Sequence, residues 1–399
     1  MRDGKTRVLV IGPTPPPHHG VAAFTRDLLA QAHDPRFELL HLDTSDRRDA
    51  SNTGKWDATN LRLGFANLAE LAGRCLKSGI DLVYVPISQN VPAFLRDALF
   101  ILESRLLWSK VVLHLHGGYF RNVYDHPSVA PDGQERAGPL DPLFRGTART
   151  ALNAAAAVIV LGNRFRPIFK GLVPDERIHV VENGVPDPGA WDLRQSAPPP
   201  DLSGARGGSG QDGTLLYMST LTRTKGIVDL IHAIAMLKTV RPNVRLKVAG
   251  TWSDEAAQAE ARALIERERL QDNVLFCGTV EGPEKAAFLS SGDIFCLPTR
   301  YPYEGQPLVL LEAMAAGLPV LATDHGVIAE TVLDGVTGRL LARDAPTERL
   351  AAALERMLSD PKTLLDWGAR GRNRYLERYA LSLCHQRLFE VFQSAVRKT

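Results

Sequence analysis

Short apolar runs rich in Val, Ile and Leu alternate along the chain with longer amphipathic stretches. This rhythm is typical of parallel strands joined by crossover helices. Each run is nearly continuous in apolar residues, which indicates strands that are buried on both faces of a sheet. In the first half of the chain the pattern predicts six strands: Arg7 to Ile11, Phe37 to Leu42, Leu82 to Val85, Val111 to Leu115, Val158 to Leu161 and Ile178 to Val181.

The rhythm stops between Pro186 and Gly213, where proline and glycine dominate, and this predicts a linker or a long surface loop. No fixed-period repeat is present. After the interruption the same pattern predicts six further strands: Leu215 to Met218, Arg245 to Ala249, Val274 to Phe276, Ile294 to Leu297, Pro319 to Ala322 and Arg339 to Leu341.

The two series of strands predict an α/β chain made of two Rossmann-like, doubly wound domains. We expect the first domain over residues 1–190, the linker or loop over 191–212 and the second domain over 213–378. Ligands of open parallel sheets bind beyond the carboxyl ends of the strands, so the chemistry is expected between the two halves.

Composition narrows the class of protein. The chain has 399 residues, and its 47 basic and 45 acidic side chains leave a net charge of +2, which gives no bulk electrostatic case for a nucleic-acid partner. The four cysteines show no spacing that indicates a zinc site or a disulfide framework, and they fit a reducing cytoplasm. Val8 to Ile11 is too short for a signal peptide, and the small-apolar run from Ala154 to Leu161 is too short to span a bilayer. Any membrane contact is therefore expected to be peripheral.

The most informative segment follows the predicted strand Ile294 to Leu297 and reads EGQPLVLLEAMAAGLP, from Glu304 to Pro319. Pro307 suits the first position of a helix. The free amides of Leu308 and Val309 would then face a phosphate, aided by the positive end of the helix dipole.

Two carboxylates flank that helix start. Gly305 lets a ligand approach the backbone closely. Glu304 precedes the helix and Glu312 lies within it, so both can accept hydrogen bonds from hydroxyls on either side of one diphosphate, a sugar on one side and a ribose on the other. The alternative is that Glu304 caps the helix and Glu312 forms a surface ion pair. An unpaired carboxylate among Leu, Val, Ala and Met would be costly to bury, which favours the first interpretation.

The phrase EGQPLVLLEAMAAGLPVLAT, with its two glutamates, resembles the hallmark of the family 4 glycosyltransferases, which have the GT-B fold. The resemblance implies that Glu304 contacts the transferred sugar and Glu312 the donor ribose. It also implies that the last helix, over residues 379–399, returns to the N-terminal domain. The donor phosphates would be held by the backbone of Gly305, Gln306, Pro307, Leu308 and Val309.

The segment Ser219 to Gly226 follows the first strand of the second half and carries two basic residues, Arg223 and Lys225. At the mouth of a parallel sheet they could neutralise a departing diphosphate, and the alternative is a solvated basic loop. The related family has Gly-Arg-Leu, three residues and then Lys-Gly, so Lys225 matches while Thr220 replaces the usual arginine. Our hypothesis is that Arg223 supplies the missing charge and binds the donor.

Other positions resemble the family's donor contacts. Gly20 lies at the entry of a predicted helix from Ala22 to Ala32, although the surrounding loop is not a GxGxxG motif. His116 precedes a glycine at the end of a predicted strand and is expected to touch the donor sugar or the developing charge. His114 lies on the same face of that strand and could equally be a structural histidine bonded to nearby backbone. The backbone at Gly278 is expected to meet the nucleobase.

Two segments of the first half have a further interpretation. Pro92 to Lys110 is predicted to form a long apolar helix, which is a core helix with basic ends or a helix lying on a membrane surface. Arg121 to Pro139 is polar and irregular, and it could face the acceptor.

The resemblance implies a glycosyltransferase that retains the anomeric configuration and uses a UDP- or GDP-linked sugar, with neither a cofactor nor a bound metal. We expect a glycan or lipid-linked acceptor, a role in surface polysaccharide or glycolipid synthesis, a cytoplasmic location and peripheral contact with the inner face of the membrane. The residues leave open whether Glu304 would act as a nucleophile or orient hydroxyls, and the resemblance favours orientation, with the acceptor attacking from the leaving-group face. The catalytic residues would be His116, Lys225 and Glu304.

Three other functions are alternatives. A nucleotide-sugar epimerase shares the GT-B fold, but no matching acid/base set is present. A glucan phosphorylase or synthase is disfavoured by the short chain. A sugar-nucleotide binding protein without catalysis remains open because of Thr220. Conversion of the donor without an acceptor would identify an epimerase, and binding without hydrolysis or transfer would identify a binding protein.

Overall fold

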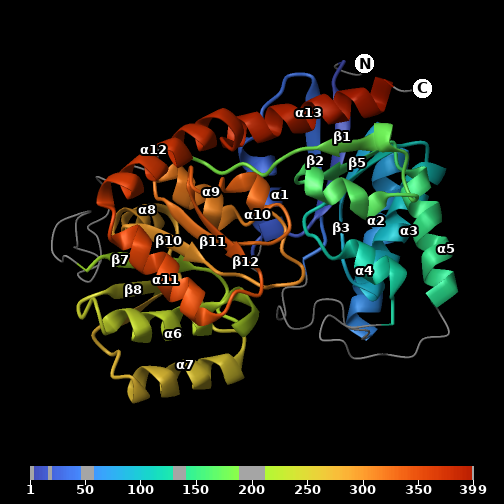
Figure 1. The fold of residues 1–399 in the computed structure, drawn as a ribbon. Coiled ribbons are helices and arrows are strands. Elements are labelled where there is room, and N and C mark those ends of the chain that lie inside the picture. The colour runs from blue at the N-terminus through green and yellow to red at the C-terminus, as the bar shows by residue number, and fades with distance from the viewer. Residues whose placement is uncertain (1–3, 17–19, 46–57, 129–140, 188–211, 398–399) are drawn as a thin grey trace. The chain divides into compact units, whose positions relative to one another are not determined.

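The computed structural model describes residues 4–16, 20–45, 58–128, 141–187 and 212–397 (Figure 1). The chain divides into two compact units, one formed by Met1–Asn183 with Ser382–Thr399 and the other by Gly184–Leu381. Each contains one six-stranded parallel sheet, which confirms the α/β class. The predicted linker lies outside the described residues except for Asp212. The part of the predicted polar segment Arg121 to Pro139 that follows Ser128 lies outside them as well.

The first sheet has the strand order β2-β1-β3-β4-β5-β6. All six predicted strands are confirmed, with ends that differ by at most two residues: β1 Thr6–Gly12, β2 Phe37–Asp43, β3 Leu82–Ile87, β4 Lys110–Leu115, β5 Ala157–Val160 and β6 Ile178–Val180. The helices of this unit are α1 Gly20–Gln31, α2 Ala58–Ser78, α3 Val91–Leu106, α4 Phe120–Asp125, α5 Asp141–Ala154 and nearly all of α13 Leu381–Arg397.

Helix α3 is shorter than the predicted Pro92 to Lys110, so that prediction is wrong at its end. The helix stops at Leu106, and Trp108 adopts a left-handed backbone with φ of 66°. Ser109 is fully buried and donates from its hydroxyl to the Ile80 carbonyl at 2.9 Å. Lys110 then begins β4 beside β3. The chain must reverse between these elements, which leaves no room for another helical turn.

Helix α13 packs on the first sheet. The ring of Phe389 stacks on Phe37 with centroids 5.0 Å apart, and Phe392 meets Tyr84 edge-on at 5.6 Å. Arg387 pairs with Glu182 at 3.1 Å. The C-terminal segment thus completes the core of the first unit.

His385 of α13 gives this unit a stability that depends on pH. The side chain is 6% exposed, and its Nε2 atom has no hydrogen-bond partner in the part of the chain that the structure describes. Burial lowers the pKa of His385 to about 4, with His33 also lowering it and Asp27 opposing both. Because the unfolded pKa is about 6.5, the neutral ring stabilises the fold fully above that pH, and this contribution is lost as the pH falls toward 4.

We therefore expect the free energy of unfolding to drop by about 1.4 kcal/mol per pH unit from this one group between about pH 6.5 and 4. Urea unfolding at pH 7, 6 and 5 measures the slope. His385→Asn, which does not titrate, should show a slope that is shallower by about one proton. Equal slopes for both proteins would contradict the assignment.

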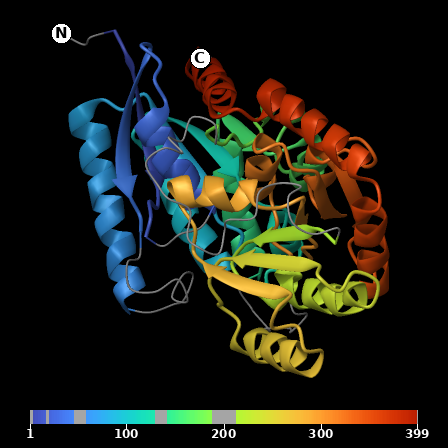
Figure 2. The same ribbon diagram turned by 90° about the vertical axis from the view of Figure 1, so that its left-hand side faces the viewer.

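The second sheet has the order β12-β11-β10-β7-β8-β9. The remaining predicted strands are confirmed: β7 Thr214–Met218, β8 Arg245–Ala249, β9 Val274–Gly278, β10 Ile294–Leu297, β11 Val320–Asp324 and β12 Gly338–Ala342. Its helices are α6 Ile227–Lys238, α7 Glu255–Arg267, α8 Gly282–Ser290, α9 Leu308–Ala315, α10 Ile328–Thr331, α11 Thr347–Leu358 and α12 Pro361–Arg378. Helices α6 and α7 lie side by side in both views (Figures 1 and 2).

The order of this sheet positions the site. The chain runs outward from β7 through β8 to β9 and then returns to the other side of β7 as β10. The loops that follow β7 and β10 therefore diverge from neighbouring strand ends, and this switch point is where ligands of open α/β sheets bind.

Candidate functional site

Lys225 and Glu304 meet at the switch point of the second unit. Lys225 ends a short 3-10 helix, Arg223–Lys225, that follows β7, and Glu304 lies in the loop after β10. The Lys225 ammonium donates to Oε1 and Oε2 of Glu304 at 2.9 and 2.8 Å. The two side chains are only 17% and 7% exposed. The structure thus joins two of the predicted site residues in one partly buried ion pair.

Several side chains that we had not singled out hold this pair. The Thr299 hydroxyl donates to Oε2 of Glu304 at 2.7 Å. The Lys225 ammonium lies 4.5 Å from the centre of the Tyr301 ring, a cation–π contact. The hydroxyl of Tyr217 donates to the Lys225 carbonyl at 3.1 Å. Each of these groups lies in or directly after β7 or β10, and this position is the signal that could have identified them.

His325 adds a neutral ring beside the pair. Its Nε2 lies 2.7 Å from the Tyr301 carbonyl. Burial lowers the pKa of His325, and the charges of Arg343 and Lys225 lower it further. The hydrogen bond to the Tyr301 carbonyl and the charge of Glu304 raise it, but the net shift is downward. Burial also raises the pKa of the Tyr301 hydroxyl, with Glu304 adding to the effect. The uncharged forms of both rings are therefore favoured beside the pair.

Helix α9 begins one residue later than its proline suggested. Pro307 precedes the helix with an extended backbone, φ −62° and ψ 121°, so its predicted place as the first helical residue is wrong. The proline ring fits both positions in φ, but here its carbonyl accepts from the Leu310 amide at 3.1 Å. The first amides of the helix, those of Leu308 and Val309, have no partner within the helix by its geometry and form a potential anion site.

Gly305 and Gln306 lie in the loop directly before the start of α9. Gln306 is 4% exposed, and its side-chain amide donates to the Thr331 hydroxyl at 2.9 Å. That side chain anchors the loop to α10. Any contact of Gln306 with a ligand would be made by its main chain.

Glu312 lies in the second turn of α9, surrounded by buried apolar side chains, and is 9% exposed. Lys285 of α8 donates to its Oε1 at 2.8 Å. The ion pair that the simpler interpretation expected is therefore present, but it is largely buried. Sequence reasoning missed Lys285, because the contact joins helices on either side of β10.

Arg223 does not join the Lys225 and Glu304 pair. Its guanidinium pairs with Glu260 of α7, its amide donates to Asp254 at 3.1 Å and its side chain is 55% exposed. Its predicted role at the donor stays a prediction. The next glycine, Gly226, has φ of 82°, and an added Cβ would lie 2.2 Å from the Pro298 carbonyl oxygen, so only glycine fits there.

Gly278 ends β9 with φ of 70°, and its carbonyl accepts from the Gly250 amide at 2.8 Å. Among the described residues, and apart from its two chain neighbours, no heavy atom lies within 4 Å of the position that a Cβ would occupy, so the space directly beside this backbone is open.

Gly20 and His116 belong to the first unit. Gly20 is the first residue of α1, and His116 directly follows β4. Phe24 of α1 contacts the His116 ring edge-on, with centroids 4.8 Å apart. The start of α1 and the end of β4 therefore lie close together within this unit.

His114 is a structural histidine, but its partner is a side chain. The Tyr84 hydroxyl lies 2.6 Å from its Nδ1 and 3.4 Å from Nε2 of His116. Burial holds the pKa of His114 well below its usual range, and the neighbouring His116 lowers it further. The uncharged form of His114 is therefore favoured, and its ring packs beside that of His116, with centroids 3.9 Å apart.

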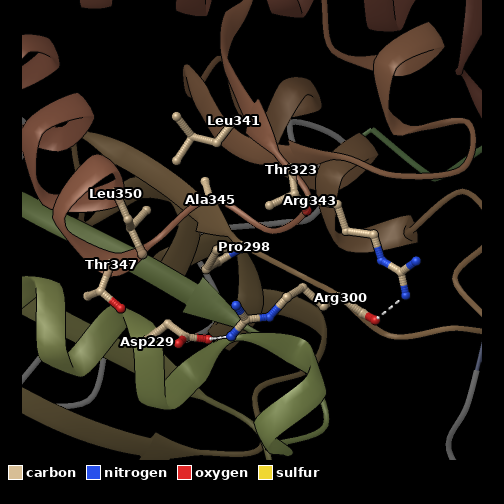
Figure 3. A pocket seen from close by; sticks show the side chains of 9 residues that line it. All are labelled: Asp229, Pro298, Arg300, Thr323, Leu341, Arg343, Ala345, Thr347 and Leu350. Carbon is tan, nitrogen blue, oxygen red and sulfur yellow. Dashed lines mark hydrogen bonds and ion pairs between the residues drawn. The ribbon is translucent and has the colours of Figure 1, made fainter. Parts of the chain in front are cut away.

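A small cavity of the second unit lies beside the loop after β10 (Figure 3). Arg300 forms an ion pair with Asp229 there, and Arg343 donates to the Arg300 carbonyl at 3.0 Å. The Arg300 amide also donates to the Thr224 carbonyl at 2.7 Å, which ties the loops that carry Lys225 and Glu304 to each other. None of the predicted donor residues is among its lining residues: Asp229, Pro298, Arg300, Thr323, Leu341, Arg343, Ala345, Thr347 and Leu350.

In the described parts of the chain, no three His, Cys, Asp or Glu side chains gather to hold a metal ion. The expectation of a metal-independent reaction stays a prediction. Among the helices of those same parts, none is long and apolar enough to cross a membrane.

The second unit matches a known family. A model of the family described as Glycosyl transferases group 1 matches residues 204–374. The chain is 30% identical over 257 residues to alpha-maltose-1-phosphate synthase of Mycolicibacterium smegmatis, covering 61% of this chain and 65% of that protein. It is 29% identical to alpha-D-kanosaminyltransferase of Streptomyces kanamyceticus, covering 65% of this chain and 64% of the relative. The match thus spans slightly less than two thirds of these curated relatives.

Solved structures resemble the whole chain. A glycosyltransferase from Rickettsia africae ESF-5 superimposes with a TM-score of 0.72 at 16% identity, covering 99% of this chain and 100% of that structure. Anabaena Alr3699/HepE in complex with UDP superimposes with a TM-score of 0.68 at 19% identity, covering 98% and 100%. At these identities the likeness concerns the fold, which is of the GT-B type.

Proposed function

We propose that the chain, whose residues 204–374 match the family model described as Glycosyl transferases group 1, is a retaining glycosyltransferase. It moves a hexosyl group from a UDP- or GDP-linked sugar to a glycan or lipid-linked acceptor in surface polysaccharide or glycolipid synthesis. The observation that carries the proposal is the Lys225 and Glu304 ion pair at the switch point, next to the free amides that begin α9.

Each of these residues has a separate role in the proposed sugar transfer. The donor diphosphate binds at the start of α9, and Lys225 gains it as a second anionic partner. As the glycosidic bond breaks, the ammonium and the helix start stabilise the charge that grows on the leaving diphosphate. Glu304 accepts hydrogen bonds from the sugar hydroxyls, and Glu312 accepts from the ribose.

The same arrangement supports a reaction without a metal. Lys225 and the amides of α9 supply the positive potential that a divalent cation would otherwise provide at the diphosphate. The chain also has no Asp-x-Asp sequence, the motif expected to hold such a cation. A uridine donor is supported by the structural neighbour that binds UDP.

The function is tested by thermal unfolding with UDP and GDP, then with their sugars. We expect one nucleotide diphosphate to raise the melting temperature, and saturation at 100 times Kd corresponds to about 2.7 kcal/mol. Transfer to an acceptor with retained configuration completes the proof. Conversion of the donor without acceptor would indicate an epimerase, binding without transfer a catalytically lost protein, and no stabilisation by either nucleotide would refute the proposal.

We also propose a cytoplasmic protein that contacts the inner face of the membrane through α3. One face of α3 belongs to the core, whereas Leu99 and Leu106, seven residues apart on the same face, are 51% and 78% exposed. Trp108 is 91% exposed just beyond the helix, and Arg105, which precedes Leu106 in the sequence, is exposed as well. An apolar stripe with a tryptophan and a cation suits an anionic lipid surface.

The double variant Leu106→Ser/Trp108→Ser should therefore lose at least about ten-fold in affinity for vesicles with anionic lipids, because two large apolar side chains no longer insert. Vesicle co-sedimentation measures the affinity. Leu365→Ser, which removes a 77% exposed leucine in the second unit, is the matched control. Equal binding by the double variant and the control would rule out this surface.

A further inference from the structure

Lys285 has no role in the mechanism proposed above, although it forms an ion pair with Glu312, which is proposed to bind the ribose. Glu312 lies among Leu310, Leu311 and Met314, all fully buried, and its side chain is 11% exposed. A carboxylate in such surroundings is costly to bury unless an opposite charge compensates for the lost water. Lys285, itself 22% exposed, provides that charge at 2.8 Å.

We propose that Lys285 positions the Glu312 carboxylate for the 2′- and 3′-hydroxyls of a ribose, and so restricts the donor to ribonucleotides and excludes 2′-deoxyribonucleotide sugars. This inference rests on the proposed function. Lys285 is a positioning residue, because it acts on the nucleotide through Glu312.

The geometry of the carboxylate supports this role. Lys285 occupies Oε1, and among the described residues Oε2 of Glu312 has no hydrogen-bond partner. One oxygen is thus fixed while the other remains to accept hydrogen bonds. Side chains of an α-helix tilt toward its amino end. Glu312 therefore leans toward the first amides of α9, where the diphosphate is proposed to bind.

The placement of Lys285 fits the ribose side of that diphosphate. Lys285 lies in the first turn of α8, which begins four residues after Gly278 at the end of β9. Both α8 and α9 start at the carboxyl edge of the sheet, on either side of β10. The Lys285 and Glu312 pair therefore lies on the same edge as the open backbone at Gly278 and the start of α9.

Discrimination follows from hydrogen bonding. A site built to bond a hydroxyl rejects an analogue without it, because the acceptor is then left without its partner. With Lys285 in place, the oriented carboxylate of Glu312 should favour the 2′-hydroxyl strongly. Without Lys285 the carboxylate can turn away, and the preference should shrink.

The experiment compares UDP with 2′-deoxy-UDP by isothermal titration, with GDP and 2′-deoxy-GDP in parallel. In the unsubstituted protein we expect the ribonucleotide to bind about 30-fold more tightly. Lys285→Gln should weaken the ribonucleotide about ten-fold and the deoxy form by less than about two-fold. Lys285→Arg, which keeps the charge, should restore most of the preference.

Arg241→Gln is the matched control, because it breaks a 2.7 Å ion pair with Glu355 in the same unit, away from the strand ends that carry the site. It should change neither affinity. Equal losses for both nucleotides in Lys285→Gln would overturn the inference, since Lys285 would then act on the base, the phosphates or the fold. Unchanged ribonucleotide binding in that variant would also overturn it. If neither UDP nor GDP binds the unsubstituted protein, the proposed function itself fails, and that result is read before any variant is made.

Discussion

Glu304→Gln is expected to lower the turnover number of sugar transfer by about 100- to 1,000-fold. Glutamine keeps the shape of the side chain and can still accept from the Thr299 hydroxyl, which now meets Glu304 at 2.7 Å. It has no negative charge, however, so it neither pairs with Lys225 nor accepts strongly from sugar hydroxyls. The affinity for the free nucleotide should change by less than about three-fold, because the nucleotide lacks the sugar that Glu304 would hold.

Initial rates at saturating donor measure the turnover number, and titration with the nucleoside diphosphate measures its affinity. Glu355→Gln removes one carboxylate from an ion pair elsewhere in the same unit and serves as the control. Turnover within a few-fold of the unsubstituted protein would remove Glu304 from the reaction.

Lys225→Ala should have two separable effects. It leaves the Glu304 carboxylate, which is only 7% exposed, without its partner, and this should cost about 3 kcal/mol in the free energy of unfolding. It also removes the cation nearest the proposed leaving group, so the turnover number should fall by about 100-fold or more.

A double-mutant cycle separates these effects. Lys225→Ala/Glu304→Gln no longer buries an unpaired charge, so it should recover most of the lost stability without recovering activity. Denaturant unfolding and initial rates of the four proteins provide the two readouts. A double variant as unstable as Lys225→Ala would mean that the lysine stabilises the fold by some route other than its pair with Glu304.

Most of the fold could be predicted from the sequence because both sheets are parallel. Strands covered on both faces leave continuous apolar runs, and all twelve such runs became strands. Helix ends were harder to predict. The apolar pattern continues past Leu106, but the left-handed turn at Trp108 depends on the buried Ser109 and on the next strand, which are tertiary constraints.

Contacts between site residues could be predicted only where these residues lie close together in the sequence. Glu304 and Glu312 could be related because they flank one helix start. Lys285 and His325 could not be related to them, because their contacts join α8 to α9 and the end of β11 to the loop after β10. Arg223 shows the converse, since it lies two residues from Lys225 yet pairs with Glu260 on another helix.

Strands β8 and β9 lie between Lys225 and Glu304 in the sequence, and this order also affects refolding. Lys225 and Glu304 are 79 residues apart, and they meet only when β10 has docked on β7. Contacts of such long sequence separation form late, after local helices. Nucleotide binding should therefore return, after dilution from denaturant, with the slow phase that completes the sheet, while the helical circular-dichroism signal returns earlier.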